Sequence, residues 1–158
     1  MDVILREAQE IDYDSINTLY TEELSFHIAL EPDMFQMFDP VMTVDWYKKQ
    51  LDNKAVVLFV AEVDESVVGV IQVMLHQSPN DPIFKKRTYV HIEDIVVGKQ
   101  FQGKGVGRSL MEAAERWAKD KGASAIELWV WRANEDAIGF YNNLGYKTNR
   151  LSMKLTLN

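Results

Sequence analysis

The chain has 158 residues, of which 47% are hydrophobic and 26% charged, and its formal net charge is −7 at pH 7. This composition is typical of a globular protein with one core and excludes a disordered class. Cysteine is absent, which excludes disulfides, thiolate metal sites and a cysteine nucleophile. The acidic balance disfavours a broad nucleic-acid-binding face and suits a cationic substrate.

Nothing in the sequence predicts a membrane segment. The longest apolar run, residues 55–61, is too short to span a bilayer. The first residues lack the basic start and apolar core of a signal peptide. We therefore expect a cytoplasmic protein that does not bind membranes.

The first third of the chain predicts one strand and two helices. Residues 3–5 are typical of a strand, and Asp12 or Asp14 can cap a helix with apolar residues at helical spacing up to residue 28. A second helix is predicted over 45–53, with Trp46 and Leu51 facing inward. Between the helices, residues 34–40 are rich in Met and Phe, which either pack as a loop on the core or form one wall of an acceptor pocket.

The middle of the chain predicts three strands. Residues 55–63 and 67–77 are rich in β-branched residues and are joined by a short turn, which indicates a hairpin. After a loop of turn formers, another strand is predicted over about residues 88–97. Strict alternation would place three of its side chains on one face and three on the other. The first set is His91, Glu93 and Ile95; the second is Ile92, Asp94 and Val96.

A glycine-rich loop separates this strand from an amphipathic helix that begins at Val106 and ends at Gly122. The predicted order ends with a strand over residues 126–131, a helix capped by Asn134 and ended by Gly145, and a terminal strand over residues 152–157.

The loop, Gln102-Gly103-Lys104-Gly105-Val106-Gly107, leaves main-chain N–H groups unobstructed at the start of a helix, which favours phosphate. A dinucleotide fingerprint fails because Arg108 or Leu110 stands where its third small residue is needed. A P-loop is disfavoured because Gly105 follows Lys104, where a magnesium-binding hydroxyl is required.

Two motifs resemble those of the GNAT superfamily of acyl-CoA-dependent N-acetyltransferases. Gln102, Gly105 and Gly107 match its Gln-x-x-Gly-x-Gly pyrophosphate motif, and residues 134–146 match its second signature, an Asn before a helix that carries Phe-Tyr and ends in Leu-Gly-aromatic. The order of elements over about residues 89–146 also resembles the superfamily core.

This resemblance implies one α/β (α+β) domain over residues 1–158. It implies a mixed, mostly antiparallel twisted sheet of about six or seven strands, splayed between the fourth and fifth strands and flanked by about four helices.

The resemblance also implies acetyl-CoA as co-substrate. The loop would hold its pyrophosphate with Lys104 and Arg108 as counter-charges, the strand edge would pair with the pantetheine amides, and Asn134 would hold the other side of the arm. A backbone N–H near Val97 would polarise the thioester carbonyl. The predicted cofactor-binding residues are Ile95, Val96, Val97, Gln102, Gly103, Lys104, Gly105, Val106, Gly107, Arg108, Asn134, Ala137 and Tyr141.

Acetyl transfer to an amine requires two proton transfers. By motif position, Tyr141 matches the residue that protonates the departing thiolate. Glu93 is the predicted base, with His91 or water as alternatives. The three histidines, at positions 27, 76 and 91, lack metal-ligand spacing, so no metal is expected.

The acceptor is left open by the sequence. Residues 91–97 resemble the matching strand of glucosamine-phosphate N-acetyltransferases, and Ile-Glu-Asp is similar to polyamine N-acetyltransferases, which favours a small primary amine. A phosphosugar would need further basic residues, for which residues 85–87 are the obvious cluster. One alternative is an acetyltransferase that acts on protein amino groups. Another is a non-catalytic acyl-CoA-binding sensor with the same fold. A homodimer is compatible with the resemblance.

Overall fold

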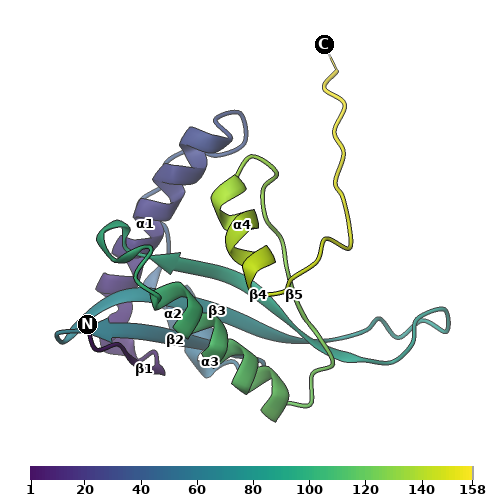
Figure 1. Ribbon diagram of the computed structural model, residues 1–158, viewed down its shortest axis with the longest axis horizontal. Coiled ribbons are helices and arrows are strands. Elements are labelled where there is room, and N and C mark those ends of the chain that lie inside the picture. Colours follow the sequence, from purple (N-terminus) through teal and green to yellow (C-terminus); the bar gives the residue numbers. More distant parts are fainter. Residues whose placement is uncertain (158) are drawn as a thin grey trace.

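One five-stranded sheet organises the computed structural model, which describes residues 1–157 (Figure 1). Its strand order is β1-β2-β3-β4-β5, with antiparallel neighbours except for the parallel pair β4 and β5. The elements are β1 (Ile4–Glu7), η1 (Glu10–Asp12), α1 (Tyr13–Leu30), α2 (Val44–Asp52), β2 (Val56–Val63), β3 (Ser66–Gln77), β4 (Thr88–Val97), η2 (Lys99–Phe101), α3 (Val106–Asp120), β5 (Ile126–Leu128) and α4 (Glu135–Asn143). The mixed, mostly antiparallel sheet and the four α-helices are confirmed.

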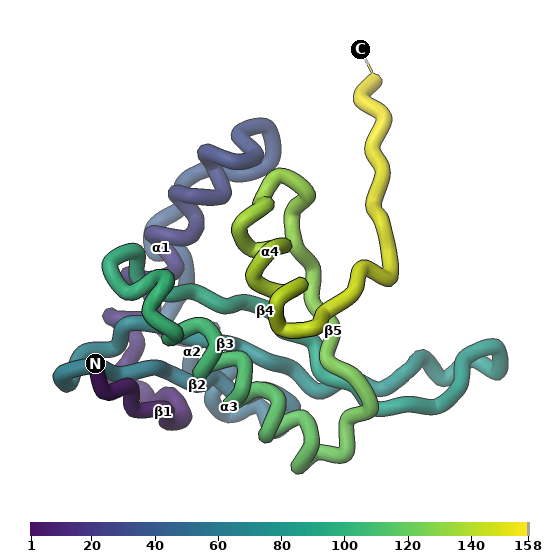
Figure 2. Tube along the Cα trace, in the orientation of Figure 1, coloured from purple at the N-terminus to yellow at the C-terminus, as the bar shows by residue number. Residues whose placement is uncertain are grey.

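The sheet has fewer strands than the six or seven expected, because the terminal strand predicted over residues 152–157 is not formed. Residues 147–157 have no regular secondary structure and run away from the body of the molecule (Figures 1 and 2). Their alternating apolar side chains, at positions 151, 153, 155 and 157, are 77–95% exposed. Alternation predicts a strand only where an edge is within reach, and this segment leaves α4 without meeting one.

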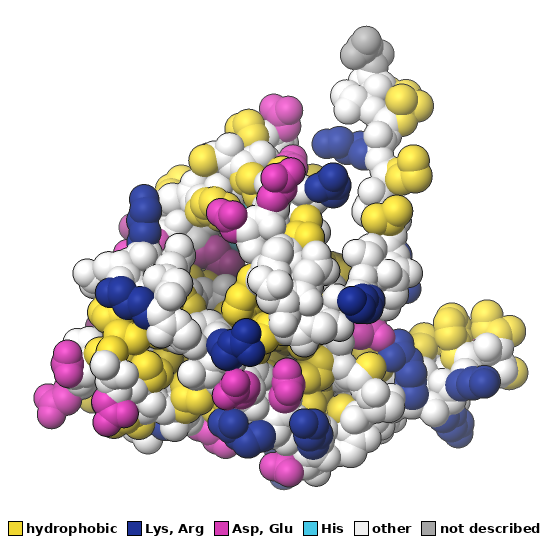
Figure 3. All heavy atoms as spheres, viewed as in Figure 1, with side chains coloured by type: hydrophobic (Ala, Val, Ile, Leu, Met, Phe, Trp, Pro, Cys, Tyr) yellow, Lys and Arg dark blue, Asp and Glu magenta, His cyan; other side chains and the backbone are white. Residues whose placement is uncertain are grey.

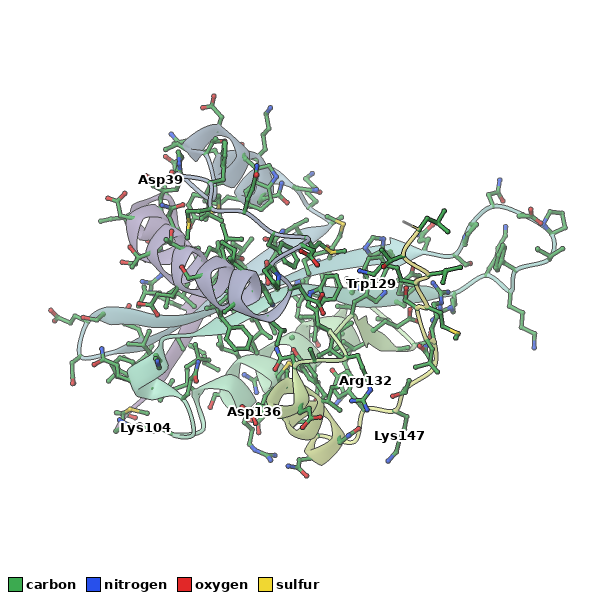
Figure 4. All side chains as sticks on the ribbon, turned by 90° about the horizontal axis from the view of Figure 1, so that it is seen from above. Asp39, Lys104, Trp129, Arg132, Asp136 and Lys147 are labelled. Atoms are coloured by element: carbon green, nitrogen blue, oxygen red, sulfur yellow. The ribbon has the colours of Figure 1, made fainter. Side chains whose placement is uncertain are left out.

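Two hydrophobic layers cover the two faces of the sheet. On one face, Val106, Leu110 and Met111 of α3 pack on buried side chains of β2, β3 and β4. On the other face, Ile16 and Leu19 of α1 and residues of α2 pack on a second set from the same strands. Seen from above, α1 lies on one side of the sheet and α3 and α4 lie on the other (Figure 4).

Local predictions hold with three corrections, at α1, β5 and α2. Asp12 is the N-cap residue of α1, but its side chain makes no cap hydrogen bond and is paired with Arg6 instead. Strand β5 ends at Leu128, short of the residues predicted to continue it. The β2–β3 hairpin forms through Asp64 and Glu65, which have φ of 48° and 62°. In α2 the fully buried residue is Tyr47, whereas Trp46, expected to face inward, is 41% exposed. Within residues 1–157, no helix combines the length and apolarity needed to cross a bilayer.

A β-bulge at Glu93 changes which side chains of β4 share a face. Val73 of β3 pairs with Ile92 and the preceding Gln72 pairs with Asp94, so Glu93 is the extra residue. A bulge shifts the two-residue alternation by one position. The faces predicted for this strand are therefore wrong beyond Ile92.

The observed faces follow from the bulge. Ile92 and Ile95, predicted on opposite faces, both pack in the layer under α3. Val96 packs in the layer under α1, and Asp94 faces the same side, where it lines a pocket with residues of α1. The bulge therefore presents Asp94 to α1.

Gly69 of β3 sets how closely α3 approaches the sheet. A Cβ at this position would lie 3.1 Å from the Val96 carbonyl oxygen, 3.2 Å from Leu110 Cδ1 and 3.3 Å from Val106 Cγ1. We expect Gly69→Val to lower the free energy of unfolding by about 2 kcal/mol, because the added volume forces α3 away. Urea denaturation measures this change.

Gly139 in α4 is the matched control, because a Cβ there would meet no heavy atom within 4 Å. Gly139→Ala should leave stability unchanged or raise it by about 0.5–1 kcal/mol. Equal destabilisation by the two variants would contradict the close approach at Gly69.

Candidate active site

The sheet opens where β4 and β5 separate. Their parallel pairing runs from Val90 and Ile126 to Ile92 and Leu128 and stops there, whereas β4 continues to Val97. The second half of β4 is therefore an open edge on the β5 side, as expected for a splayed sheet.

The orientation of the peptide groups at this edge follows from the end of β4. The Gly98 N–H donates to the Val68 carbonyl oxygen at 2.9 Å. Because main-chain groups alternate between the two sides of a strand, those of Val97 and Ile95 point toward the opening. The Gln102 side chain already uses one of them, since its Nε2 donates to the Val97 carbonyl oxygen at 3.0 Å.

The glycine loop holds two residues in the left-handed region, Gly103 with φ 70° and Gly105 with φ 90°. A Cβ on either would meet no heavy atom within 4 Å, so it is the backbone conformation that requires glycine here. Gly105 is the N-cap of α3 and has no side chain to satisfy the first N–H groups of the helix. Those N–H groups and the positive end of the helix dipole are thus available to an anion.

The side chains around the loop are basic or closely packed. Lys104, labelled in Figure 4, is exposed, and its Nζ lies 5.6 Å from the centroid of the Phe101 ring. Arg108 is also exposed. A Cβ on Gly107 would lie 3.4 Å from Phe140 Cζ and 3.8 Å from Val97 Cγ2. Gly107 therefore fixes the start of α3 against both β4 and α4.

Predicted site residues belong to helix α4, among them Asn134 as its N-cap and Tyr141 in its last turn. The Asn134 Oδ1 accepts from the Ala137 N–H at 3.1 Å, which confirms the predicted cap and leaves the amide nitrogen for other partners. The half-buried Tyr141 ring lies 5.3 Å from Phe140 and 5.8 Å from Tyr146. Burial, with a smaller contribution from the acidic pair of Glu23 and Asp94, raises the pKa of Tyr141, so its hydroxyl keeps its proton at neutral pH.

A pocket of about 520 Å³ opens between α1, the segment before α2, and β4. Figure 3 shows the surface hollowed between α1 and α4, with acidic side chains at the bottom. The pocket is lined by Tyr20, Glu23, Leu24, His27, Phe35, Val41, Met42, Thr43, Trp46, Asp94 and Trp131. Phe35 is the member of the Met- and Phe-rich segment that forms a wall of this pocket.

Two carboxyl groups meet in this pocket. Glu23 of α1 and Asp94 of β4 are hydrogen-bonded to each other. Burial raises the pKa of both, and the negative charge of Asp94 raises that of Glu23 further. Two buried carboxyl groups in contact do not both ionise readily, so we expect the pair to share one proton at neutral pH.

The predicted base Glu93 lies beside this pair but contacts other groups. Its Oε1 is 3.3 Å from His91 Nδ1 and 3.5 Å from His76 Nε2, and its side chain is 37% exposed. His91 stacks edge-on against Trp129, at 5.2 Å between centroids, and its Nε2 is buried without a hydrogen-bond partner in residues 1–157. Glu93 and its two histidines therefore form a cluster next to the pocket.

The sequence interpretation brought the loop, the β4 edge and α4 together but missed the contribution of α1. The signal was present, because Glu23 and His27 continue the helical spacing of Ile16, Leu19 and Tyr20 and so place polar groups in an apolar stripe. Within residues 1–157, no three His, Cys, Asp or Glu side chains are placed to hold a metal ion.

Comparison with known proteins places the chain in a family. The model of the GNAT acetyltransferase family matches residues 14–146, and the chain belongs to this family. It is 24% identical over 160 residues to the L-amino acid N-acetyltransferase AaaT of Escherichia coli, covering 99% of this chain and 90% of that protein. It is 35% identical to an uncharacterised N-acetyltransferase of Methanocaldococcus jannaschii across 65% of this chain, and spans only 44% of that relative's length.

A solved structure has the same fold. The crystal structure of a mutant of the BH1408 protein of Bacillus halodurans superimposes with a TM-score of 0.95 at 28% identity, covering 98% of this chain and 99% of that one. The two proteins therefore share their architecture over nearly their whole length.

The carboxyl pair in the pocket predicts an unusual pH dependence of stability. Because the folded-state pKa of Glu23 lies above its ordinary value of 4.5, the unfolded chain ionises first as pH rises, and the native state loses stability between the two values. We expect Glu23→Gln, which keeps a donor to Asp94, to be more stable than the parent by about 1–3 kcal/mol at pH 8 and by much less at pH 5.

Urea unfolding at both pH values measures the difference, with Glu22→Gln, at an exposed neighbour on α1, as the control. A Glu23→Gln variant whose gain does not grow with pH would show that Glu23 is ionised in the folded protein.

Proposed function

We propose that the protein transfers the acetyl group of acetyl-CoA to a small primary amine by direct attack in a ternary complex. The observation that carries the proposal is the meeting, around the open half of β4, of an uncapped helix start, a free strand edge and a protonated tyrosine. Membership of the GNAT family supports acetyl transfer in general. The absence of cysteine removes the commonest acyl-enzyme route.

The chain has a group for each part of the cofactor. The N–H groups of the loop from Gly103 to Arg108 face the pyrophosphate, and the two basic side chains there neutralise its charge. At the open edge, the main-chain groups of Ile95 and the N–H of Val97 pair with the pantetheine amides, as an added strand would, whereas the main-chain groups of Val96 face β3. The free amide nitrogen of Asn134, with Ala137 behind it, holds the other side of the arm.

The reacting groups lie at the inner end of that edge. The N–H of Val97 or a neighbour polarises the thioester carbonyl, and a carboxylate of β4, Glu93 or Asp94, takes the proton of the acceptor ammonium. The neutral nitrogen attacks the carbonyl carbon, and the carbon–sulfur bond breaks. The hydroxyl of Tyr141, which carries its proton at neutral pH, protonates the sulfur.

The acceptor side supports a small molecule. The pocket of about 520 Å³ is walled by side chains of α1, of the segment before α2 and of Trp131, which suits a compact ligand. The Escherichia coli relative is named for L-amino acids, which are also small amines.

The glycine loop is tested by adding a methyl group to it. Gly103→Ala should weaken acetyl-CoA binding, measured by calorimetry, at least tenfold, because φ of 70° strains any other residue and displaces the N–H groups. Gly122→Ala, with the same φ of 70° at the far end of α3, is the matched control for strain and should bind normally. Equal affinities of the two variants would place the cofactor elsewhere.

The acid is tested by removing one hydroxyl. Tyr141→Phe should lower kcat by about 100-fold or more, since the thiolate then leaves without a proton donor, while acetyl-CoA still binds. Thiol release in an amine panel gives the rate. Tyr146→Phe removes a neighbouring buried hydroxyl from the same aromatic group and should keep most of the activity. Comparable losses in both variants would indicate a packing role for Tyr141.

A further inference from the structure

We infer that Glu23, Asp94 and Tyr20 form the acceptor-ammonium site, with Asp94 as the proton acceptor, and that the acceptor is an arylalkyl or alkyl primary monoamine that carries no carboxylate or phosphate. The inference rests on the proposed function and adds the base and the substrate class. It is carried by the arrangement of charged, hydroxyl and aromatic side chains around the pocket.

The first step concerns charge. The hydrogen-bonded carboxyl pair of Glu23 and Asp94 lies at the pocket wall and shares one proton, so it presents one negative charge. One ammonium group balances that charge, whereas a polyamine would bring further positive charges among apolar walls. The pair therefore selects a monocation.

The second step concerns an unused hydroxyl. Tyr20 is 6% exposed and lines the same pocket, and its hydroxyl has no hydrogen-bond partner within residues 1–157. A buried hydroxyl without a partner costs free energy unless a ligand satisfies it. Tyr20 lines the pocket together with both members of the carboxyl pair, Glu23 and Asp94. An acceptor nitrogen held by that pair gives Tyr20 a partner.

The third step concerns the rest of the acceptor. His27 stacks on Phe35 at 5.5 Å, and Phe35 meets Trp131 edge-on at 5.5 Å, so three aromatic rings form one continuous wall. Trp46 lines the pocket beside them. Aromatic walls favour a flat or apolar substituent on the amine.

The fourth step concerns what the pocket lacks. Among its lining residues in the described part of the chain there is no Lys or Arg, and burial lowers the pKa of His27, which keeps that ring neutral. A carboxylate or phosphate on the acceptor would thus have no counter-charge. The basic cluster at residues 85–87 does not supply one, since its residues do not line the pocket and Arg87 is paired with Glu127 at 2.7 Å.

The proton balance is complete with these groups. The ammonium gives one proton to Asp94, and the resulting amine forms the new carbon–nitrogen bond as the carbon–sulfur bond breaks. Tyr141 gives its proton to sulfur and regains one from the acylated nitrogen. Asp94 then releases its proton to solvent, so one amide, one thiol and one proton leave. Glu23 stays protonated and acts as a positioning residue that donates to Asp94.

Matched acceptors test the substrate class. Thiol release is measured with tryptamine, phenethylamine and hexylamine, with tryptophan and phenylalanine as the same skeletons bearing a carboxylate, and with spermidine and glucosamine 6-phosphate. We expect kcat/KM for tryptamine to exceed that for tryptophan by at least 100-fold. A preference for the carboxylated, phosphorylated or polyamine acceptors, or no turnover of any arylalkyl or alkyl amine, overturns the inference.

The proposed function can fail separately. If acetyl-CoA does not bind, or binds without thiol release for any acceptor, including lysine-containing peptides, the function itself is wrong. If thiol release occurs only with peptides or with the excluded acceptors, the proposed acetyl transfer is supported and the inferred acceptor class is wrong.

Isosteric variants test the residues. Asp94→Asn should lower kcat at least 100-fold with unchanged acetyl-CoA affinity, and Glu22→Gln, on the exposed side of α1, should behave as the parent. A larger loss in Glu93→Gln than in Asp94→Asn would move the base to Glu93 and overturn the assignment. Circular dichroism and calorimetry with acetyl-CoA check that each variant is folded.

The positioning role of Glu23 has its own readout. Burial raises the pKa of Asp94, and the hydrogen bond from Glu23 lowers it. Glu23→Ala removes that hydrogen bond and should therefore shift the acidic limb of the pH profile of kcat/KM to higher pH. Glu23→Gln restores a donor and should return the limb to its original position. Tyr20, His27, Glu93 and Tyr141 are the other titratable groups around the pair, and all are retained in both variants. An unshifted limb in Glu23→Ala leaves Glu23 a packing residue and overturns its assigned role.

Discussion

The candidate site depends on the place where β4 loses its partner. The pairing with β5 ends at Ile92 and Leu128, and the bulge at Glu93 follows at once. The first event leaves peptide groups of the strand edge without a neighbour in the sheet, and the second turns Asp94 toward α1. A continuous, regularly alternating strand would provide neither an edge for an amide-bearing arm nor an acid in the pocket. Both halves of the proposed chemistry therefore originate within one strand.

The elements were predictable from the sequence because they depend on local patterns. The amphipathic spacing from Val106, the Asn134 cap and the turn at Asp64 and Glu65 each concern residues close in the chain, and all three are found in the structure. The terminal strand was not predictable in this way. Its alternation satisfies the pattern, but pairing requires an edge elsewhere in the fold, and residues 147–157 do not meet one.

The candidate site was partly predictable for the same reason. The glycine loop and Tyr141 belong to contiguous motifs, whereas the Glu23–Asp94 pair joins residues from α1 and β4. A bulge leaves no clear composition signal, so strict alternation placed Asp94 with Ile92. Once the extra residue at Glu93 is counted, Asp94 lies on the face of the sheet that is covered by α1, the helix that carries Glu23.

An acid pair withdrawn from water has a cost that a bound cation can offset. Taking two carboxyl groups out of water raises their pKa values and lowers stability as pH rises. In a chain with net charge −7, acidic groups at the surface would cost less. The proposed monocationic acceptor would restore the charge balance while it is bound and would lose its charge when it gives up its proton. The cost of burying the carboxyl pair would thus favour binding of the ammonium, and the neutral amine formed from it would no longer be held by that charge.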